Sequence, residues 1–221
     1  MQELYLTEAA AGRNTGLVRR AFAAGIDVTQ VTDRAAAVLS DTQAPQGIVA
    51  RCKMIDVSLQ TALAGSPKLV AVLVQTNDPG NAGTIIRLAD AAGADAVIIA
   101  GDAVDPFNSK VVRATAGSLF HLPIARVDDP ATVLEPLAAA GLSTLATTGN
   151  AQLDLDVAAR DGLLDLPTAW LFGSEAHGLP PEIIAAADAA VRVPIHGRAE
   201  SLNLATAAAL FLYASAGAHR R

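Results

Sequence analysis

Continuous apolar runs alternate with stretches of helical periodicity over the last two thirds of this chain of 221 residues. The runs Leu69–Val74 and Ala96–Ala100 lack polar positions, which is typical of strands covered on both faces of a sheet. Because strands that alternate with helices form parallel sheets, we expect an α/β fold with a mostly parallel sheet and helices on both faces. The expected strands lie at 69–74, 96–100, 121–127, 143–148, 168–173 and 189–194, and the expected helices at 82–92, 109–116, 130–140, 180–187 and 201–216.

The front of the chain follows a separate pattern. It predicts a helix over 10–24, strands over 27–31 and 47–53, and a helix over 33–39. After it we expect a linker near Asp56–Lys68, where the segment TALAGSPK carries Gly65, Ser66 and Pro67, which are turn and linker residues. We therefore expect a small α/β region over 1–60 and a larger domain over 66–221.

Composition narrows the function classes. The formal net charge of −6 disfavours binding of nucleic acid by bulk electrostatics, although a local basic patch remains compatible with it. The charged fraction of 17% is low and indicates extra buried surface, as in an oligomer. The single cysteine, Cys52, fits a reducing compartment, and no apolar run is long enough to span a membrane. From these two observations we expect a cytoplasmic protein. No histidine has a second ligand at zinc-type spacing, so we expect no metal.

Ligands of open α/β sheets bind beyond the carboxyl ends of the strands. Four segments at such positions are rich in Gly, Asn, Ser or Thr, namely 75–83, 147–151, 173–178 and 194–201. The first leads into Asn81, expected as a helix N-cap, and Gly83, expected to let a ligand approach the backbone. Arg87 follows one turn later, either to bind a phosphate or carboxylate or simply as an exposed side chain. Both common nucleotide fingerprints, G-x-G-x-x-G and G-K-[ST], are missing from this segment.

Two later segments carry the remaining polar candidates. In LFGSEAHGL, glycines on both sides of Glu175 predict a sharp loop that presents one carboxylate, which could also serve only the loop's own amides. Further on, Ser201 or a neighbour is expected to cap the last helix, with Asn203 in its first turn. Asn203 could pin this helix to a nearby loop or take part in chemistry directly, because a buried unpaired amide is costly.

The order and spacing of three motifs resemble the SpoU/TrmH family of RNA 2′-O-ribose methyltransferases, which belong to the SPOUT class. The motifs are N-x-G-x-x-x-R over 81–87, F-G-S-E-x-x-G-L over 172–179 and P-I-x-G-x-x-E-S-L-N-L over 194–204. The resemblance covers residues 69–216 and includes the segment 107–124. Segment 40–52 is similar to the end of the family's small substrate-binding domain, which we expect to be incomplete over 1–60.

The resemblance implies a C-terminal trefoil knot, S-adenosyl-L-methionine as the methyl donor, and a homodimer with the active site at its interface. Transfer of the methyl group to a ribose 2′-hydroxyl would need no metal. The residues that the resemblance assigns to the methyl donor are Thr147, Thr148, Gly149, Leu171, Gly173, Val193, Ile195, Leu202 and Leu204.

The resemblance also assigns the catalytic residues Arg87, Glu175, Ser201 and Asn203. Because a guanidinium stays protonated, we expect Arg87 to hold the target phosphate and stabilise the developing alkoxide rather than to act as a base. Glu175 is expected to orient Arg87 or Asn203, while Ser201 and Asn203 shape the pocket. RNA contacts are expected from Asn81, Lys110 and Arg113, and from the front residues Arg13, Arg19, Arg20, Arg51 and Lys53.

The RNA itself is expected to be ribosomal, since a separate front domain suits a large structured target. Three alternatives remain open at this point. The chain could modify transfer RNA, could be a non-catalytic RNA-binding module on the same fold, or could be a nicotinamide or nucleotide enzyme. The missing glycine fingerprint weighs against the last of these.

Overall fold

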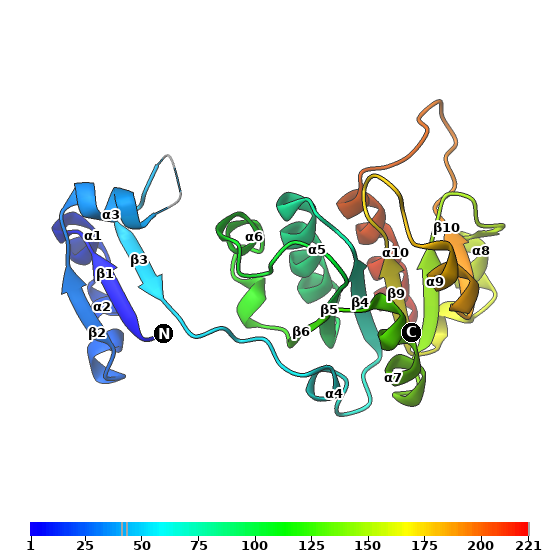
Figure 1. Cartoon of the computed structure of the whole chain (residues 1–221), viewed down its shortest axis with the longest axis horizontal. Helices are drawn as coiled ribbons and strands as arrows, with labels where there is room; N and C mark the ends of the chain where they lie inside the picture. Colours follow the sequence, from blue (N-terminus) through cyan, green and yellow to red (C-terminus); the bar gives the residue numbers. More distant parts are fainter. Residues whose placement is uncertain (41, 43, 221) are drawn as a thin grey trace. The chain divides into compact units, whose positions relative to one another are not determined.

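The computed structural model of the chain describes residues 1–40, 42 and 44–220 (Figure 1). Asp41 and Gln43, which belong to the segment 40–52, and Arg221 lie outside the described residues. The chain divides into two compact units, Met1–Met54 and Ile55–Arg221.

The first unit is a three-stranded sheet with helices. Its elements are β1 (Glu3–Leu6), α1 (Glu8–Arg13), α2 (Thr15–Ala23), β2 (Asp27–Gln30), α3 (Asp33–Leu39) and β3 (Ile48–Arg51). The strand order is β2-β1-β3, with β1 parallel to β2 and antiparallel to β3. Leu4 and Leu6 alternate with half-buried positions along β1 and form the core with Ala21 of α2.

The sequence patterns predicted β2, α3 and β3 correctly but missed β1, whose four residues carry only two buried positions. The helix expected over 10–24 is two helices, because the chain turns at Asn14 between α1 and α2. Gly12, Asn14 and Gly16 lie around this point, and both residue types are weak helix formers.

The second unit is built on a seven-stranded sheet in which every strand pair is parallel. In the sheet the order is β6-β5-β4-β9-β7-β10-β8. The strands are β4 (Leu69–Val74), β5 (Ala96–Ala100), β6 (Ile124–Val127), β7 (Ser143–Thr147), β8 (Leu153–Asp154), β9 (Thr168–Phe172) and β10 (Ala189–Arg192). The helices are α4 (Leu59–Ala62), α5 (Pro79–Ala92), α6 (Ser109–Ala114), α7 (Leu134–Ala139), α8 (Leu155–Arg160), α9 (Pro181–Ala186) and α10 (Leu204–Ala218), and short 3-10 turns lie at Ser118–Phe120, Pro130–Val133 and Leu163–Asp165.

Helices cover both faces of this sheet, which confirms the expected layers. Along β4, alternate residues enter two different cores. Leu69, Ala71 and Leu73 lie on one face of the sheet, and Val70, Val72 and Val74 lie on the other. The first core contains side chains of α5, α6, α8 and α10, and the second contains side chains of α4, α7 and α9. Both faces of the strands are therefore buried, as their continuous apolar runs predicted.

The last strands do not extend the sheet in chain order. β9 lies between β4 and β7, and β10 lies between β7 and β8. The trefoil knot that the resemblance implies stays a prediction. The expected linker is partly packed: the Val57 amide donates to the Ile124 carbonyl at 2.9 Å, and Leu63 is buried.

Within the described part of the chain, no helix is long and apolar enough to cross a membrane.

Candidate functional site

A cavity of about 490 Å³ opens where three neighbouring strands of the sheet end. The loops after β7, β9 and β10 form its wall, together with the first turns of α10. Its lining residues are Thr147, Thr148, Gly149, Gly173, Ser174, Glu175, Gly178, Arg192, Val193, Ile195, Glu200, Ser201, Leu202, Asn203, Leu204, Ala207 and Phe211. The cavity lies at the position that the strand-end rule for α/β sheets predicts.

All residues expected around the methyl donor line this cavity except Leu171. The side chain of Leu171 points to the opposite face of the sheet, because it alternates with Trp170 and Phe172, and is fully buried there. Its carbonyl lies nearer the site and accepts a hydrogen bond of 2.8 Å from the Thr147 hydroxyl.

Glu175 stands on a tight loop that closes directly after β9. Ser174 and Gly178 exchange two backbone hydrogen bonds of 3.1 and 2.9 Å, which leaves three residues at the tip. Gly178 has a φ of 70°, a backbone conformation that favours glycine. At Gly173 a Cβ would lie 2.1 Å from the carbonyl carbon of Gly178, so the loop closes only over a glycine. The predicted sharp loop around Glu175 is confirmed.

A chain of hydrogen bonds joins the three motif segments beside the cavity. The Asn203 side-chain amide donates to the Oδ1 of Asn81 at 2.9 Å, and the Asn81 amide donates to the Oε1 of Glu175 at 2.9 Å. Asn203 is also the N-cap of α10, since its Oδ1 accepts from the Thr206 amide at 3.2 Å. Asn81 thus fixes a carboxylate and a helix cap relative to each other.

Two expectations about the segment at 77–87 are wrong. The N-cap of α5 is Asp78, which accepts from the Asn81 amide at 2.7 Å, and Pro79 opens the helix. Proline suits the first helical position because it needs no N–H donor there, so the cap lies three residues before the expected one. Gly83 is buried against α6 and exposes no backbone to a ligand: a Cβ would lie 2.6 Å from the Cβ of Ala114.

Arg87 lies one turn beyond Gly83, exposed on α5 and outside the cavity wall. Among the described residues it has no hydrogen bond or ion pair, and Glu175 does not pair with it. Lys110 and Arg113 are exposed on α6, which packs against α5 at Gly83. The structure therefore brings Glu175, Ser201 and Asn203 together at the cavity and places the three basic residues on the adjoining helix pair.

Sequence patterns missed two charged residues of the cavity wall. Arg192 at the end of β10 donates from its Nε to the carboxylate of Asp154, the last residue of the short strand β8. Glu200 lies in the loop before α10. The glutamate is part of the third motif, so its position carried a signal, whereas the Arg192–Asp154 pair depends on the strand order.

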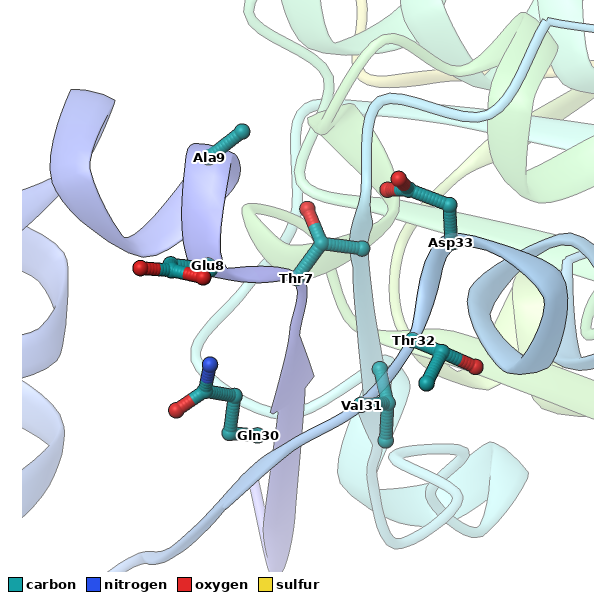
Figure 2. A pocket seen from close by; sticks show the side chains of 7 residues that line it. All are labelled: Thr7, Glu8, Ala9, Gln30, Val31, Thr32 and Asp33. Atoms are coloured by element: carbon teal, nitrogen blue, oxygen red, sulfur yellow. The ribbon is translucent and has the colours of Figure 1, made fainter.

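A second hollow of about 840 Å³ lies in the first unit and gathers none of the predicted site residues (Figure 2). Glu8 and Asp33 line it, which disfavours a phosphate there. The hydroxyls of Thr7 and Thr32 cap α1 and α3. Arg51, expected to contact RNA, instead forms two hydrogen bonds of 2.9 and 2.6 Å with Glu3. The Arg51 guanidinium holds the pKa of the Glu3 carboxyl below its ordinary value.

The described residues contain no group of three or more His, Cys, Asp or Glu side chains placed to hold a metal ion.

Comparisons with known proteins agree on both units. The family model of the SpoU rRNA Methylase family matches residues 68–213, and a model described as RNA 2′-O ribose methyltransferase substrate binding matches residues 1–57. The 23S rRNA (guanosine(2553)-2′-O)-methyltransferase RlmP of Bacillus subtilis is 35% identical over 190 residues, which cover 86% of this chain and 72% of that protein. A 23S rRNA (uridine(2479)-2′-O)-methyltransferase of Streptomyces viridochromogenes is 37% identical over 174 residues, which cover 77% of this chain and 60% of that protein.

Solved structures give the same result. A structure of AdoMet-bound rRNA methyltransferase from Sinorhizobium meliloti superposes with a TM-score of 0.82 at 31% identity, covering 97% of this chain and 78% of that one. The SpoU methyltransferase AviRb from Streptomyces viridochromogenes, in complex with AdoMet, superposes with a TM-score of 0.82 at 28% identity, covering 98% of this chain and 82% of that one.

Proposed function

Because this chain belongs to the SpoU rRNA Methylase family, we propose that it transfers a methyl group from S-adenosyl-L-methionine to a ribose 2′-hydroxyl of ribosomal RNA. The observation that carries the proposal is the hydrogen-bonded chain Asn203–Asn81–Glu175 at the rim of the strand-end cavity. Two relatives named as 23S rRNA 2′-O-methyltransferases, one for a guanosine and one for a uridine, support ribosomal RNA as the substrate.

The cavity fits this donor in size and chemistry. Its volume of about 490 Å³ lies within the roughly 300–1,000 Å³ usual for small-molecule sites. At Gly149 a Cβ would meet nothing within 4 Å, so the loop backbone is open to a ligand. Ile195 and Leu202 are 39% and 37% exposed and offer apolar surface for an adenine. When bound, the donor supplies an electrophilic methyl group on a sulfonium centre.

We assign the roles of the chain's own residues from their positions. Arg87 is exposed on α5, where the described residues offer it no ion-pair partner, and it would hold the phosphate of the target nucleotide and stabilise the charge that develops on the ribose oxygen. Asn81 would act as a positioning residue, since both ends of its side-chain amide are used by Glu175 and Asn203. Ser201 would shape the pocket for the ribose, and Lys110 and Arg113 would contact neighbouring phosphates.

The front region, 1–60, would contact the RNA in addition to the catalytic domain, 66–221. Arg19 and Arg20 on α2 are exposed, and the described part of the chain gives them no ion pair. They are better placed for phosphates than Arg51, whose charge is compensated by Glu3.

A homodimer would bury the apolar stripe of α10. Leu210 and Tyr213 are three residues apart on this helix and are 44% and 51% exposed. Side chains at this spacing share one helix face, so a second copy could cover both. Light scattering tests this assembly: Leu210→Glu should give a monomer where the wild type gives a dimer, and a monomeric wild type would refute it.

Calorimetry with S-adenosyl-L-methionine and a tritium-transfer assay on 23S rRNA fragments test the proposed activity. We expect Arg87→Ala to abolish transfer while donor binding stays within about twofold, because Arg87 lies outside the cavity wall. Arg160→Ala, at an exposed position with its side chain 72% exposed on α8, is the matched control and should keep full activity. A wild-type chain that binds the donor and methylates only transfer RNA would refute the ribosomal substrate.

A further inference from the structure

The cavity wall carries an excess of negative charge. Of its three charged residues, Arg192 is compensated by Asp154, which does not line the cavity. Glu175 accepts a hydrogen bond from the neutral side-chain amide of Asn81, and no residue that the structure describes forms an ion pair with it. Glu200 is exposed and has no hydrogen bond or ion pair with any residue that the structure describes. Two carboxylates on the cavity wall therefore have no cationic partner in the described part of the chain.

Methyl transfer changes the charge of the ligand that the cavity holds. The carbon–sulfur bond breaks and leaves its electron pair on sulfur, a carbon–oxygen bond forms, and the hydroxyl proton passes to water or a phosphate. A donor with one sulfonium, one ammonium and one carboxylate has a net charge of about +1. The thioether product keeps only the ammonium and the carboxylate and is neutral overall.

We propose that Glu200, acting with Glu175, makes the cavity discriminate between the cationic methyl donor and its neutral thioether product. Glu200 is the member of the pair that can be tested alone, because Glu175 also holds Asn81. The inference rests on the proposed function, since it concerns the same cavity and the same donor. For turnover, this preference means that the donor competes more effectively than the thioether product for the empty cavity.

The size of the cavity sets the size of the effect. A sphere of 490 Å³ has a radius of about 5 Å, so a cation near its centre lies about 5 Å from the wall, which is within the screening length of about 8 Å at physiological salt. Glu200 is exposed, which means that water weakens its field to nearly the bulk value. We expect its charge to favour the donor by about two- to fourfold at low salt, and to lose this effect in about 1 M salt.

Calorimetry of the full chain with S-adenosyl-L-methionine and S-adenosylhomocysteine tests the inference. Glu200→Gln should raise the donor Kd about two- to fourfold at roughly 10 mM salt and leave the product Kd within about 1.5-fold. The difference should vanish at about 1 M salt, and Glu200→Asp should restore most of the wild-type ratio. Glu135→Gln, which removes an exposed carboxylate from the first turn of α7, is the matched control and should change neither affinity.

Two results would overturn the inference. Equal weakening of donor and product by Glu200→Gln would show a structural role for the side chain, and an unchanged ratio would show that its charge does not act on the ligand. Steady-state kinetics add an independent readout, because loss of a charge that acts only on donor binding should raise KM for the donor while kcat stays unchanged. A wild-type chain that binds neither compound would refute the proposed function itself, whereas normal binding with an unchanged ratio refutes only the role of Glu200.

Discussion

Replacement of Gly83 by alanine tests whether this glycine serves helix packing or ligand approach. A Cβ at this position would lie 2.6 Å from the Cβ of Ala114 and 2.6 Å from the carbonyl oxygen of Val111. Favourable contacts need about 3.5–4.0 Å, so α6 must move by about 1 Å or its side chains must distort. Overpacking of this kind costs roughly 1–3 kcal/mol, against a gain of about 1 kcal/mol from better helix propensity. Because one of the two clashing atoms belongs to the backbone of α6, we expect a net loss of about 1–2 kcal/mol.

Urea unfolding followed by tryptophan fluorescence measures this loss. Trp170 is the only tryptophan of the chain and is fully buried in β9, so its emission reports on the unit Ile55–Arg221. The control is Gly217→Ala in α10, where a Cβ would meet nothing within 4 Å and stability should stay equal or rise by up to about 1 kcal/mol. A Gly83→Ala protein as stable as the wild type would refute the packing role. If the same protein lost donor binding, the role in ligand approach that the sequence suggested would be restored.

Three further substitutions test the contacts described above. Asn203→Asp keeps the cap acceptor of α10 but removes the side-chain amide donor, so methyl transfer should fall while stability changes by less than about 0.5 kcal/mol. Asn203→Ala removes the cap as well and should also cost about 1 kcal/mol in urea unfolding. A fully active Asn203→Asp protein would argue against a role of the Asn203–Asn81 hydrogen bond in transfer. Ser215→Ala leaves the buried Nε1 of Trp170 without its 2.9 Å acceptor and should cost about 1–3 kcal/mol in the same assay, which an unchanged urea midpoint would contradict. A hydrogen bond with Ser118 lowers the pKa of Asp90 below its ordinary value of 3.8, so its stabilising contribution is complete above that pH and is lost as the pH falls through the folded-state pKa. Asp90→Asn should therefore reduce the drop in urea midpoint between about pH 6 and about pH 3, and a drop as steep as that of the wild type would exclude this contribution.

Hydrophobic patterning was sufficient for the central sheet because burial on both faces leaves an unmistakable apolar run. β4 and β5 occupy the predicted residues, and the helix that follows β4 ends at Gly93 as expected. β8 escaped the pattern because its two residues are too few to establish a period, and α8, which follows it directly, was missed with it.

Local capping chemistry was less well predicted. Asp78 and Asn81 are both good N-cap residues three positions apart, and only the backbone conformation shows that Asp78 caps α5. Similarly, a glycine in a first helical turn suits a ligand or a neighbouring helix equally well, and the position of α6 decides between them at Gly83.

The sequence by itself determined the layers of the fold, the strand-end position of the site and the motif residues, because periodicity and turn chemistry depend on neighbours along the chain. Only the tertiary structure decided which of these residues meet. The bonds from Asn81 to Glu175 and from Asn203 to Asn81 span 94 and 122 residues. They form because β9 lies beside β4, so that the loop after β9 lies next to the first turn of α5. That strand order is set by the packing of the whole sheet and leaves no local signal in the sequence.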